Sequence, residues 1–300
     1  MNLRLVLPAA ICATALLLTS QPGTPERVGP DGKGGFLLPI GWTLRPAGRH
    51  VQLDTFPMTV VPSPDHRFLV ALNGGRNKPS LSVIDVRSEK EIQRLPVNDL
   101  WLGLAFNKVG NRLYAGGGAQ SRVYEFSFDN GQLAPTREFP GPSPATASER
   151  VFLGDITLSP DESSLFVTSL YQDALLEFTL PSGELKRKIP TGSRPYRVRF
   201  TPDAKSLIVS SWGDNRVVLH DPASGAETAR LDAGLHPTDF LFDKKGRLFV
   251  AAANTNTVAV FRPENGQWTR AETLNVALTP RQPAGMTPSA LALSPNHERL

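Results

Sequence analysis

The chain has 300 residues, with 32 lysines and arginines against 28 aspartates and glutamates, and so carries a formal net charge of +4. This small excess gives no reason to expect nucleic acid as a partner. The 25 glycines and 27 prolines exclude helical bundles and coiled coils and are typical of a chain rich in turns.

The N-terminus has the pattern of a secretory signal peptide. A short basic start, Met1–Arg4, precedes an apolar run over Leu5–Leu18 that is too short to span a bilayer comfortably. We therefore expect a signal peptide over residues 1–20, a flexible linker over 21–35, and a periplasmic or secreted protein with no transmembrane span after cleavage. The only cysteine, Cys12, lies inside the signal, so the mature chain would have neither a disulfide nor a catalytic thiol.

The rest of the chain is built from one repeating pattern. Each unit has an alternating apolar strand, a turn of the Ser/Thr-Pro-Asp type, a nearly continuous apolar strand, and two further strands joined at a glycine. The first residues of these turns, spaced 44, 52, 42, 42 and 51 residues apart, are Ser63, Asn107, Ser159, Thr201, Asp243 and Ser294. A period near 42 residues with four short strands per unit predicts an all-β fold, a β-propeller of four-stranded antiparallel blades, over residues 36–300.

The units do not complete a ring within the 300 residues. Five whole blades run from about Pro57 to Thr287, and a sixth begins at Pro288 and has reached only its second strand at Leu300. Upstream, Arg49–Leu53 has the pattern of an outer strand that would complete the last blade. We therefore interpret the sequence as the N-terminal part of a longer chain.

These repeats resemble the YVTN-repeat, YncE-like β-propellers, through the Ser-Pro-Asp turns, the strand Leu248–Asn254 and the strand Ser82–Val86. Further stretches resemble a bacterial subgroup in which such a propeller precedes a phosphoesterase domain of the alkaline-phosphatase superfamily: Gly41–Gly48, Trp101–Phe106, Ser210–Asp221 and Pro283–Pro295. The resemblance implies seven blades in the parent chain and a C-terminal phosphoesterase domain whose catalytic residues would follow Leu300. The propeller itself would then be a non-catalytic module that binds or positions a partner.

One end of the sheets is the predicted binding face. In a four-stranded meander, the loop between the second and third strands and the connection to the next blade emerge at the same end. Two of these connections, Pro140–Phe152 and Ala277–Thr287, are long, and insertions confined to one side are how repeat folds build binding surfaces. The candidate binding residues at this end are Trp101, Arg194, Trp212 and His236. Loop decoration without a ligand is the alternative.

A second candidate site lies nearer the axis of the propeller. Equivalent positions of the innermost strands carry Asp155, Arg197 and Asp239 in three consecutive blades. An isolated buried charge is unfavourable, so these side chains should be paired or hydrated. Structural pairing of Arg197 with Asp155 or Asp239 is the first interpretation. A set of ligands for an anion or a small polar molecule is the second.

No catalytic or cofactor motif stands out. The chain lacks a Gly-x-Ser-x-Gly elbow, a phosphate-binding glycine loop and a dinucleotide fingerprint, and its five histidines are scattered. We expect no catalytic residue, metal ligand or cofactor in this segment, whose partner would be a small polar ligand or a protein. Two alternatives stay open. One is a propeller enzyme of the sugar-lactone hydrolase type that uses Asp155, Arg197, Asp239 and His236, and the other is a cell-surface interaction module.

Overall fold

The structure is a computed structural model, and it describes residues 27–45, 47–279 and 281–300. The predicted signal peptide, residues 1–20, lies outside the described residues. The chain divides into two compact units, one ending at His50 and the other running over Val51–Leu300.

The first unit contains a small antiparallel sheet of three two-residue strands, β1 (Gly29–Pro30), β2 (Phe36–Leu37) and β3 (Thr43–Leu44). Asp31 shapes the turn between β1 and β2, because its Oδ1 accepts hydrogen bonds from the backbone N–H groups of Lys33 and Gly35. This turn joins residues of the expected linker to β2. Residues 49–53, where an outer strand is predicted, contain no strand.

The second unit contains five four-stranded antiparallel sheets, numbered here as blades 1 to 5 in chain order. Blade 1 comprises β4 (Pro57–Pro62), β5 (Phe68–Asn73), β6 (Ser80–Asp85) and β7 (Lys90–Pro96). Blade 2 comprises β8 (Leu104–Phe106), β9 (Arg112–Gly116), β10 (Arg122–Asp129) and β11 (Gln132–Pro140). Blade 3 comprises β12 (Leu153–Leu158), β13 (Ser164–Ser169), β14 (Ala174–Thr179) and β15 (Glu184–Pro190), with the short 3-10 helix η1 (Leu170–Gln172) between β13 and β14. Blade 4 comprises β16 (Pro195–Phe200), β17 (Leu207–Ser211), β18 (Arg216–His220) and β19 (Glu227–Asp232). Blade 5 comprises β20 (Pro237–Phe242), β21 (Leu248–Ala252), β22 (Thr257–Glu264) and β23 (Gln267–Asn275).

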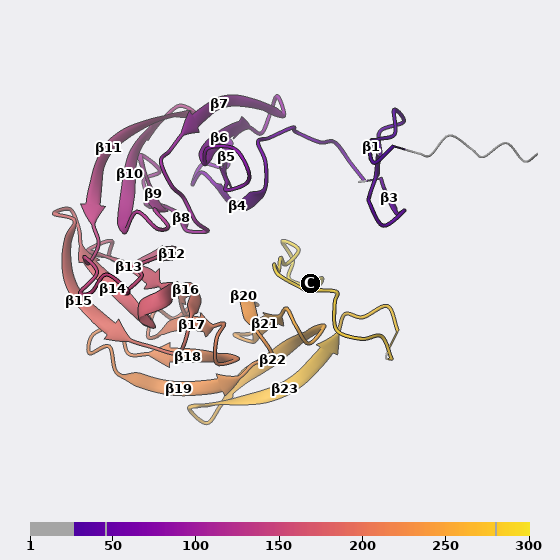
Figure 1. The fold of residues 1–300 in the computed structure, drawn as a ribbon. Helices are drawn as coiled ribbons and strands as arrows, with labels where there is room; N and C mark the ends of the chain where they lie inside the picture. Colours follow the sequence, from indigo (N-terminus) through magenta and orange to yellow (C-terminus); the bar gives the residue numbers. More distant parts are fainter. Residues whose placement is uncertain (1–26, 46, 280) are drawn as a thin grey trace, which may run out of the picture. The chain divides into compact units, whose positions relative to one another are not determined.

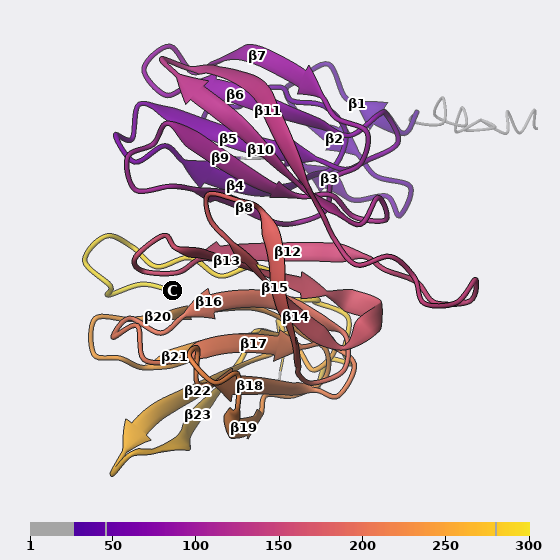
Figure 2. The ribbon, with the colours of Figure 1, turned by 90° about the vertical axis from the view of Figure 1, so that its left-hand side faces the viewer.

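The blades stand side by side with their first strands inward. On the inner side β4 contacts β8, β8 contacts β12, β12 contacts β16 and β16 contacts β20, and on the outer side β11 touches both β7 and β15. Figure 1 shows the five sheets following one another around a curve from β4 to β23, and Figure 2 shows them from the side. The segment 288–293 continues this order, because Leu291 N–H donates to Asp239 Oδ2 on β20 at 2.8 Å. The predicted all-β propeller is confirmed.

The turn between the first two strands has the same construction in blade after blade. In blade 3, Ser159 Oγ accepts a hydrogen bond from the Ser164 N–H at 2.9 Å and donates to Asp161 Oδ1 at 2.6 Å. Where the sequence departs from Ser-Pro-Asp, the side chains of Asn107 and Asp243 accept the equivalent backbone hydrogen bonds. The third residue after the turn's first residue has a positive φ, which favours glycine, and Gly110 and Gly246 occupy that position in the two variant turns.

One cluster of buried apolar side chains fills each junction between neighbouring blades. Between blades 2 and 3, for example, Tyr114 and Phe139 pack against Leu153 and Phe178, which are buried. A hairpin glycine of the following blade fits against this layer: Gly183 has φ +77°, and a Cβ built there would lie 2.4 Å from Phe139 Cδ1. The apolar layers therefore fix how adjacent blades meet, and leave the loops at the sheet ends free to differ.

Candidate functional site

The register of each sheet brings its second-to-third-strand loop and its connection to the next blade to one end. In blade 3, Ala174 at the start of β14 pairs with Ser169 at the end of β13 and with Pro190 at the end of β15. Leu153 at the start of β12 pairs with Ser169 as well. Trp101, Arg194, Trp212 and His236 all belong to loops at this end of their sheets, which we call the loop face.

Arg194 and His236 occupy equivalent positions just before a proline that opens an inner strand. Both have positive φ, 53° and 56°. Each backbone N–H is capped by a side chain of the preceding blade: Arg194 N–H donates to Asp173 Oδ1 at 2.8 Å, and His236 N–H donates to Asn215 Oδ1 at 3.0 Å. These hydrogen bonds stabilise the uncommon left-handed backbone conformation and so fix the position of the Cα atom from which each side chain extends.

The candidate residues of the loop face form two groups. Trp212 is 39% exposed and stacks on His236, with ring centroids 3.9 Å apart and planes at 15°. In the other group Trp101 meets Phe152 edge to face at 5.5 Å, Phe152 meets Tyr171 at 5.8 Å, and the Arg194 guanidinium lies 4.7 Å from the centre of the Tyr171 ring. From the sequence, Phe152 and Tyr171 are predicted only to lie in loops. Their ring contacts across the blade junction cannot be predicted from the repeat, because such contacts do not recur at a fixed position.

The three charged residues nearer the axis lie together. Arg197 Nη1 is 3.8 Å from Asp155 Oδ1, and Arg197 Nε is 3.4 Å from Asp239 Oδ1. The Asp155 side chain is fully buried, and those of Arg197 and Asp239 are 12% and 15% exposed. The predicted grouping of an arginine between two aspartates is therefore present, and we call it the inner charged triad.

Asp155 also has a structural role. Its Oδ2 accepts a hydrogen bond from the Val198 N–H of the next blade at 3.0 Å and another from Arg199. Arg199 is not among the residues that the repeat pattern predicts for this site. It stands two residues after Arg197 on the same strand and therefore faces the same side. Asp155 Oδ1 and Arg197 Nε are buried and have no hydrogen-bond partner among the described residues. Part of the hydrogen-bonding capacity of the triad is thus unused within the described residues.

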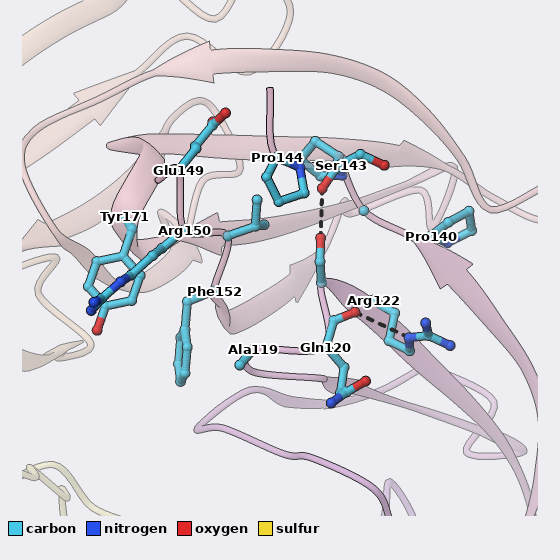
Figure 3. A pocket seen from close by; sticks show the side chains of 14 residues that line it. Ala119, Gln120, Arg122, Pro140, Ser143, Pro144, Glu149, Arg150, Phe152 and Tyr171 are labelled. Carbon is cyan, nitrogen blue, oxygen red and sulfur yellow. Dashed lines mark hydrogen bonds between the residues drawn. The ribbon is translucent and has the colours of Figure 1, made fainter. Parts of the chain in front are cut away.

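The long connection between blades 2 and 3 borders a cavity of about 690 Å³ on the loop face. Figure 3 shows its walls, with Arg150 and Tyr171 on one side, Gln120 and Arg122 on the other, and Phe152 between them. The cavity has the size of a small-molecule site.

Within the described residues, no group of three or more histidine, cysteine, aspartate or glutamate side chains is placed to hold a metal ion. A search of the same residues for long apolar helices that could span a membrane finds none.

One protein of known sequence resembles part of this chain. Antigen Lp49 of Leptospira interrogans is 25% identical over 194 residues, which make up 60% of this chain and 35% of that protein. The chain thus matches about a third of that relative's length.

Two solved structures share the fold. The hydrazine synthase of Kuenenia stuttgartiensis superposes with a TM-score of 0.65 at 19% identity, over 84% of this chain and 74% of that one. A candidate 6-phosphogluconolactonase of Bacteroides uniformis superposes with a TM-score of 0.64 at 18% identity, over 86% of this chain and 79% of that one. The family model described as "Lactonase, 7-bladed beta-propeller" matches residues 59–231, and this chain accordingly belongs to that family of propellers.

Proposed function

We propose that this propeller hydrolyses a lactone, the ring ester of a small polyhydroxylated acid, at the inner charged triad. The observation that carries the proposal is Arg197, a largely buried guanidinium held between two carboxylates, whose Nε–H makes no hydrogen bond although Asp239 Oδ1 lies 3.4 Å away. Membership of a family described as lactonases supports the same reaction class. This reading replaces a non-catalytic propeller as the first hypothesis.

Hydrolysis of a lactone requires a hydrogen-bond donor for the carbonyl oxygen and a base for the attacking water. Water adds to the ester carbonyl carbon, the bond from that carbon to the ring oxygen breaks, and the ring oxygen takes up a proton. Arg197 Nε–H would donate a hydrogen bond to the carbonyl oxygen, whose negative charge grows as water adds. Asp239 Oδ1 would accept the proton of the attacking water, since Asp239 keeps its other oxygen on the Leu291 N–H and is itself partly exposed.

Asp155 and His236 have supporting roles in this scheme. Asp155 is a positioning residue, because its carboxylate is buried, bonded to blade 4, and set against Arg197. Trp212 and His236 form a flat, partly exposed stack that can bind the face of a ligand ring.

The proposal is tested by following acid release from a panel of five- and six-membered sugar lactones. Arg197→Gln and Asp239→Asn should each lower kcat by about 100-fold or more, because each removes a group that acts in the transition state. Arg230→Gln is the matched control, since Arg230 lies on the outer strand β19 in an exposed ion pair with Glu227, and it should leave kcat unchanged. A wild-type protein that hydrolyses no lactone faster than buffer would overturn the proposal, provided circular dichroism shows the folded β protein.

The second candidate function is a binding or scaffolding module of a longer, YncE-like chain that carries a phosphoesterase domain. It is favoured by the match to Lp49, which spans only 35% of that protein, and by the structural bonds that occupy Asp155. This reading predicts saturable binding of a small polar ligand or a protein without turnover. We further propose an extracytoplasmic location, because of the predicted signal peptide, and fractionation of the expressing cell tests it.

A further inference from the structure

Neighbouring blades are clasped on the loop face by one recurring residue. The residue just before each third strand has a left-handed backbone at Ser121, Asp173, Asn215 and Asn256, with φ between 47° and 64°. The carbonyl of that residue accepts a hydrogen bond from the start of the connection to the next blade, as Asp173 O does from the Thr191 N–H at 2.9 Å. The position is therefore built in the same way at four successive junctions.

At three of these junctions the side chain of this residue also closes the gap to the next blade. Asp173 and Asn215 bond the backbone N–H of Arg194 and His236, as described above. Asn256 does the same for the long connection after blade 5: its Oδ1 accepts from the Gly285 and Met286 N–H groups at 2.9 Å, and its Nδ2 donates to Pro283 O at 2.9 Å. Asn256 thus fixes part of this long connection to blade 5.

The junction between blades 2 and 3 is different because serine stands at the clasping position. Ser121 Oγ donates to Pro142 O at 2.9 Å, near the start of the connection, and does not reach the residue before β12. The two blades are joined here by the backbone instead, through hydrogen bonds between Gly118 and Leu153 in both directions, at 3.0 and 2.8 Å. The 690 Å³ cavity lies beside this bridge and is bordered by Ser121 and by Phe152.

The side chains around the cavity combine aromatic surface with positive charge. Phe152 and Tyr171 line one part of it, and Tyr171 is 40% exposed. Arg150 is exposed and makes no ion pair or hydrogen bond among the described residues, while Arg122 pairs with Glu138. Glu149 also lines the cavity and is an ionised carboxylate, because hydrogen bonds from Gln172 Nε2 and the Ala145 N–H, one to each of its oxygens, lower the pKa of Glu149.

We propose that this cavity binds an anionic saccharide, with the sugar ring against Tyr171 and Phe152 and its carboxylate on Arg150. Aromatic side chains offer a flat apolar surface to the C–H face of a sugar ring, and a guanidinium pairs with a carboxylate through two parallel hydrogen bonds. The site is separate from the inner charged triad, and it takes a sugar acid whose ring is not a lactone. Binding here and lactone hydrolysis can therefore succeed or fail independently.

The test compares two probes that differ only at C6, methyl α-D-galactopyranosiduronate with a carboxylate and methyl α-D-galactopyranoside with a hydroxymethyl group, titrated by saturation-transfer NMR. The wild-type protein should bind the uronate at least fivefold more tightly than the neutral glycoside. Arg150→Gln should bring the two affinities to within twofold of each other, and Tyr171→Ala should weaken both. Arg281→Gln is the matched control, because Arg281 is an exposed arginine on the other long connection, and it should leave the fivefold preference intact.

Several results would overturn the proposal. These are equal affinity of the wild type for the two probes, no binding of either probe, or an effect of Arg281→Gln as large as that of Arg150→Gln. Because Arg150 is exposed and unpaired, its replacement should not affect folding, and a circular dichroism melt of each variant checks this. A further variant, Ser121→Asp, places at this junction the residue found at Asp173, and it should weaken uronate binding by adding a clasping side chain and a negative charge.

Discussion

Asp155 accepts a hydrogen bond from the backbone N–H of Val198, 43 residues further along the chain, at 3.0 Å. One carboxylate thereby connects the inner strand of blade 3 to that of blade 4, while its other oxygen faces Arg197. Asp239 repeats the arrangement two blades further on, where it accepts from the Leu291 N–H at 2.8 Å. Inter-blade attachment and the charge pattern of the proposed reaction centre thus share the same side chains.

Replacing Asp155 should be strongly destabilising. In Asp155→Ala the Val198 N–H loses its acceptor, Arg199 loses its counter-charge and Arg197 loses one of its two, so we expect the free energy of unfolding to fall by about 3–5 kcal/mol. Urea denaturation followed by circular dichroism measures this. Glu227→Gln, which breaks an exposed ion pair with Arg230, should cost about 1 kcal/mol or less. Similar losses in the two variants would contradict the role given to Asp155.

The hairpin glycines should respond to alanine according to what surrounds them. Gly183 and Gly266 have nearly the same φ, +77° and +78°, but a Cβ at Gly183 would lie 2.4 Å from Phe139, whereas a Cβ at Gly266 would meet nothing within 4 Å. Gly266→Ala should cost about 1–2 kcal/mol for the strained backbone, and Gly183→Ala about 1–3 kcal/mol more for the overpacked junction. Thermal melts of the pair compare the two costs, and equal shifts in Tm would show that Phe139 moves aside freely.

His220 should make stability fall as the solution is acidified. Its ring is buried, Nδ1–H donates to Gly225 O at 3.1 Å, and Nε2 accepts from Thr191 Oγ1 at 2.8 Å. Burial lowers the pKa of His220 below its ordinary 6.5, outweighing the opposing effects of the hydrogen bond to the Gly225 carbonyl and of the charge of Glu227. Below about pH 6.5 the unfolded chain therefore binds a proton that the folded chain does not, and the free energy of unfolding drops by up to about 1.4 kcal/mol per pH unit.

Denaturation curves between pH 7.5 and pH 5.5 measure this slope. His220→Gln should flatten it, whatever the variant does to stability at pH 7.5. An unchanged slope in the variant would assign the effect to other groups.

The pKa of Asp161 should report the bonding within the turn of blade 3. Its Oδ1 accepts from Ser159 Oγ and from the Ser163 N–H, and these bonds lower the pKa of Asp161 to about 2. Ser159→Ala removes the hydrogen bond that lowers this pKa most, so the pKa of Asp161 should rise toward the ordinary value of 3.8. A pH titration of the side-chain carboxyl carbon by NMR measures both. An unchanged midpoint would mean that Ser163 alone holds the ionised form.

The repeat pattern predicts the fold and the inner charged triad because both depend on position within the unit. Ser159 and Thr201 mark equivalent turns, and Asp155, Arg197 and Asp239 then fall at equivalent places on inner strands without any knowledge of the coordinates. The long connection Pro140–Phe152 likewise identifies where the blades depart from the common pattern.

Other features depend on distances that no periodicity encodes. Ser121 and Asn256 hold the two long connections through different partners, and this difference becomes visible only when their hydrogen bonds are known. The pairing of Asp155 with Arg199 depends on how two neighbouring strands cross. The small sheet around β2 depends on one turn, at Asp31, that the composition of the linker conceals.

At Ser121 the packing that holds two blades together and the surface that would recognise a ligand are formed largely by different residues. Residues that keep blades 2 and 3 together, such as Tyr114, Phe139 and Val151, lie in an apolar layer, and most other residues around the cavity belong to loops outside it. Substitutions in segment 142–150 can therefore accumulate without eroding foldability. Such a region is where descendants of one ancestral gene would diverge in what they recognise, and where a laboratory library would best be placed to change it.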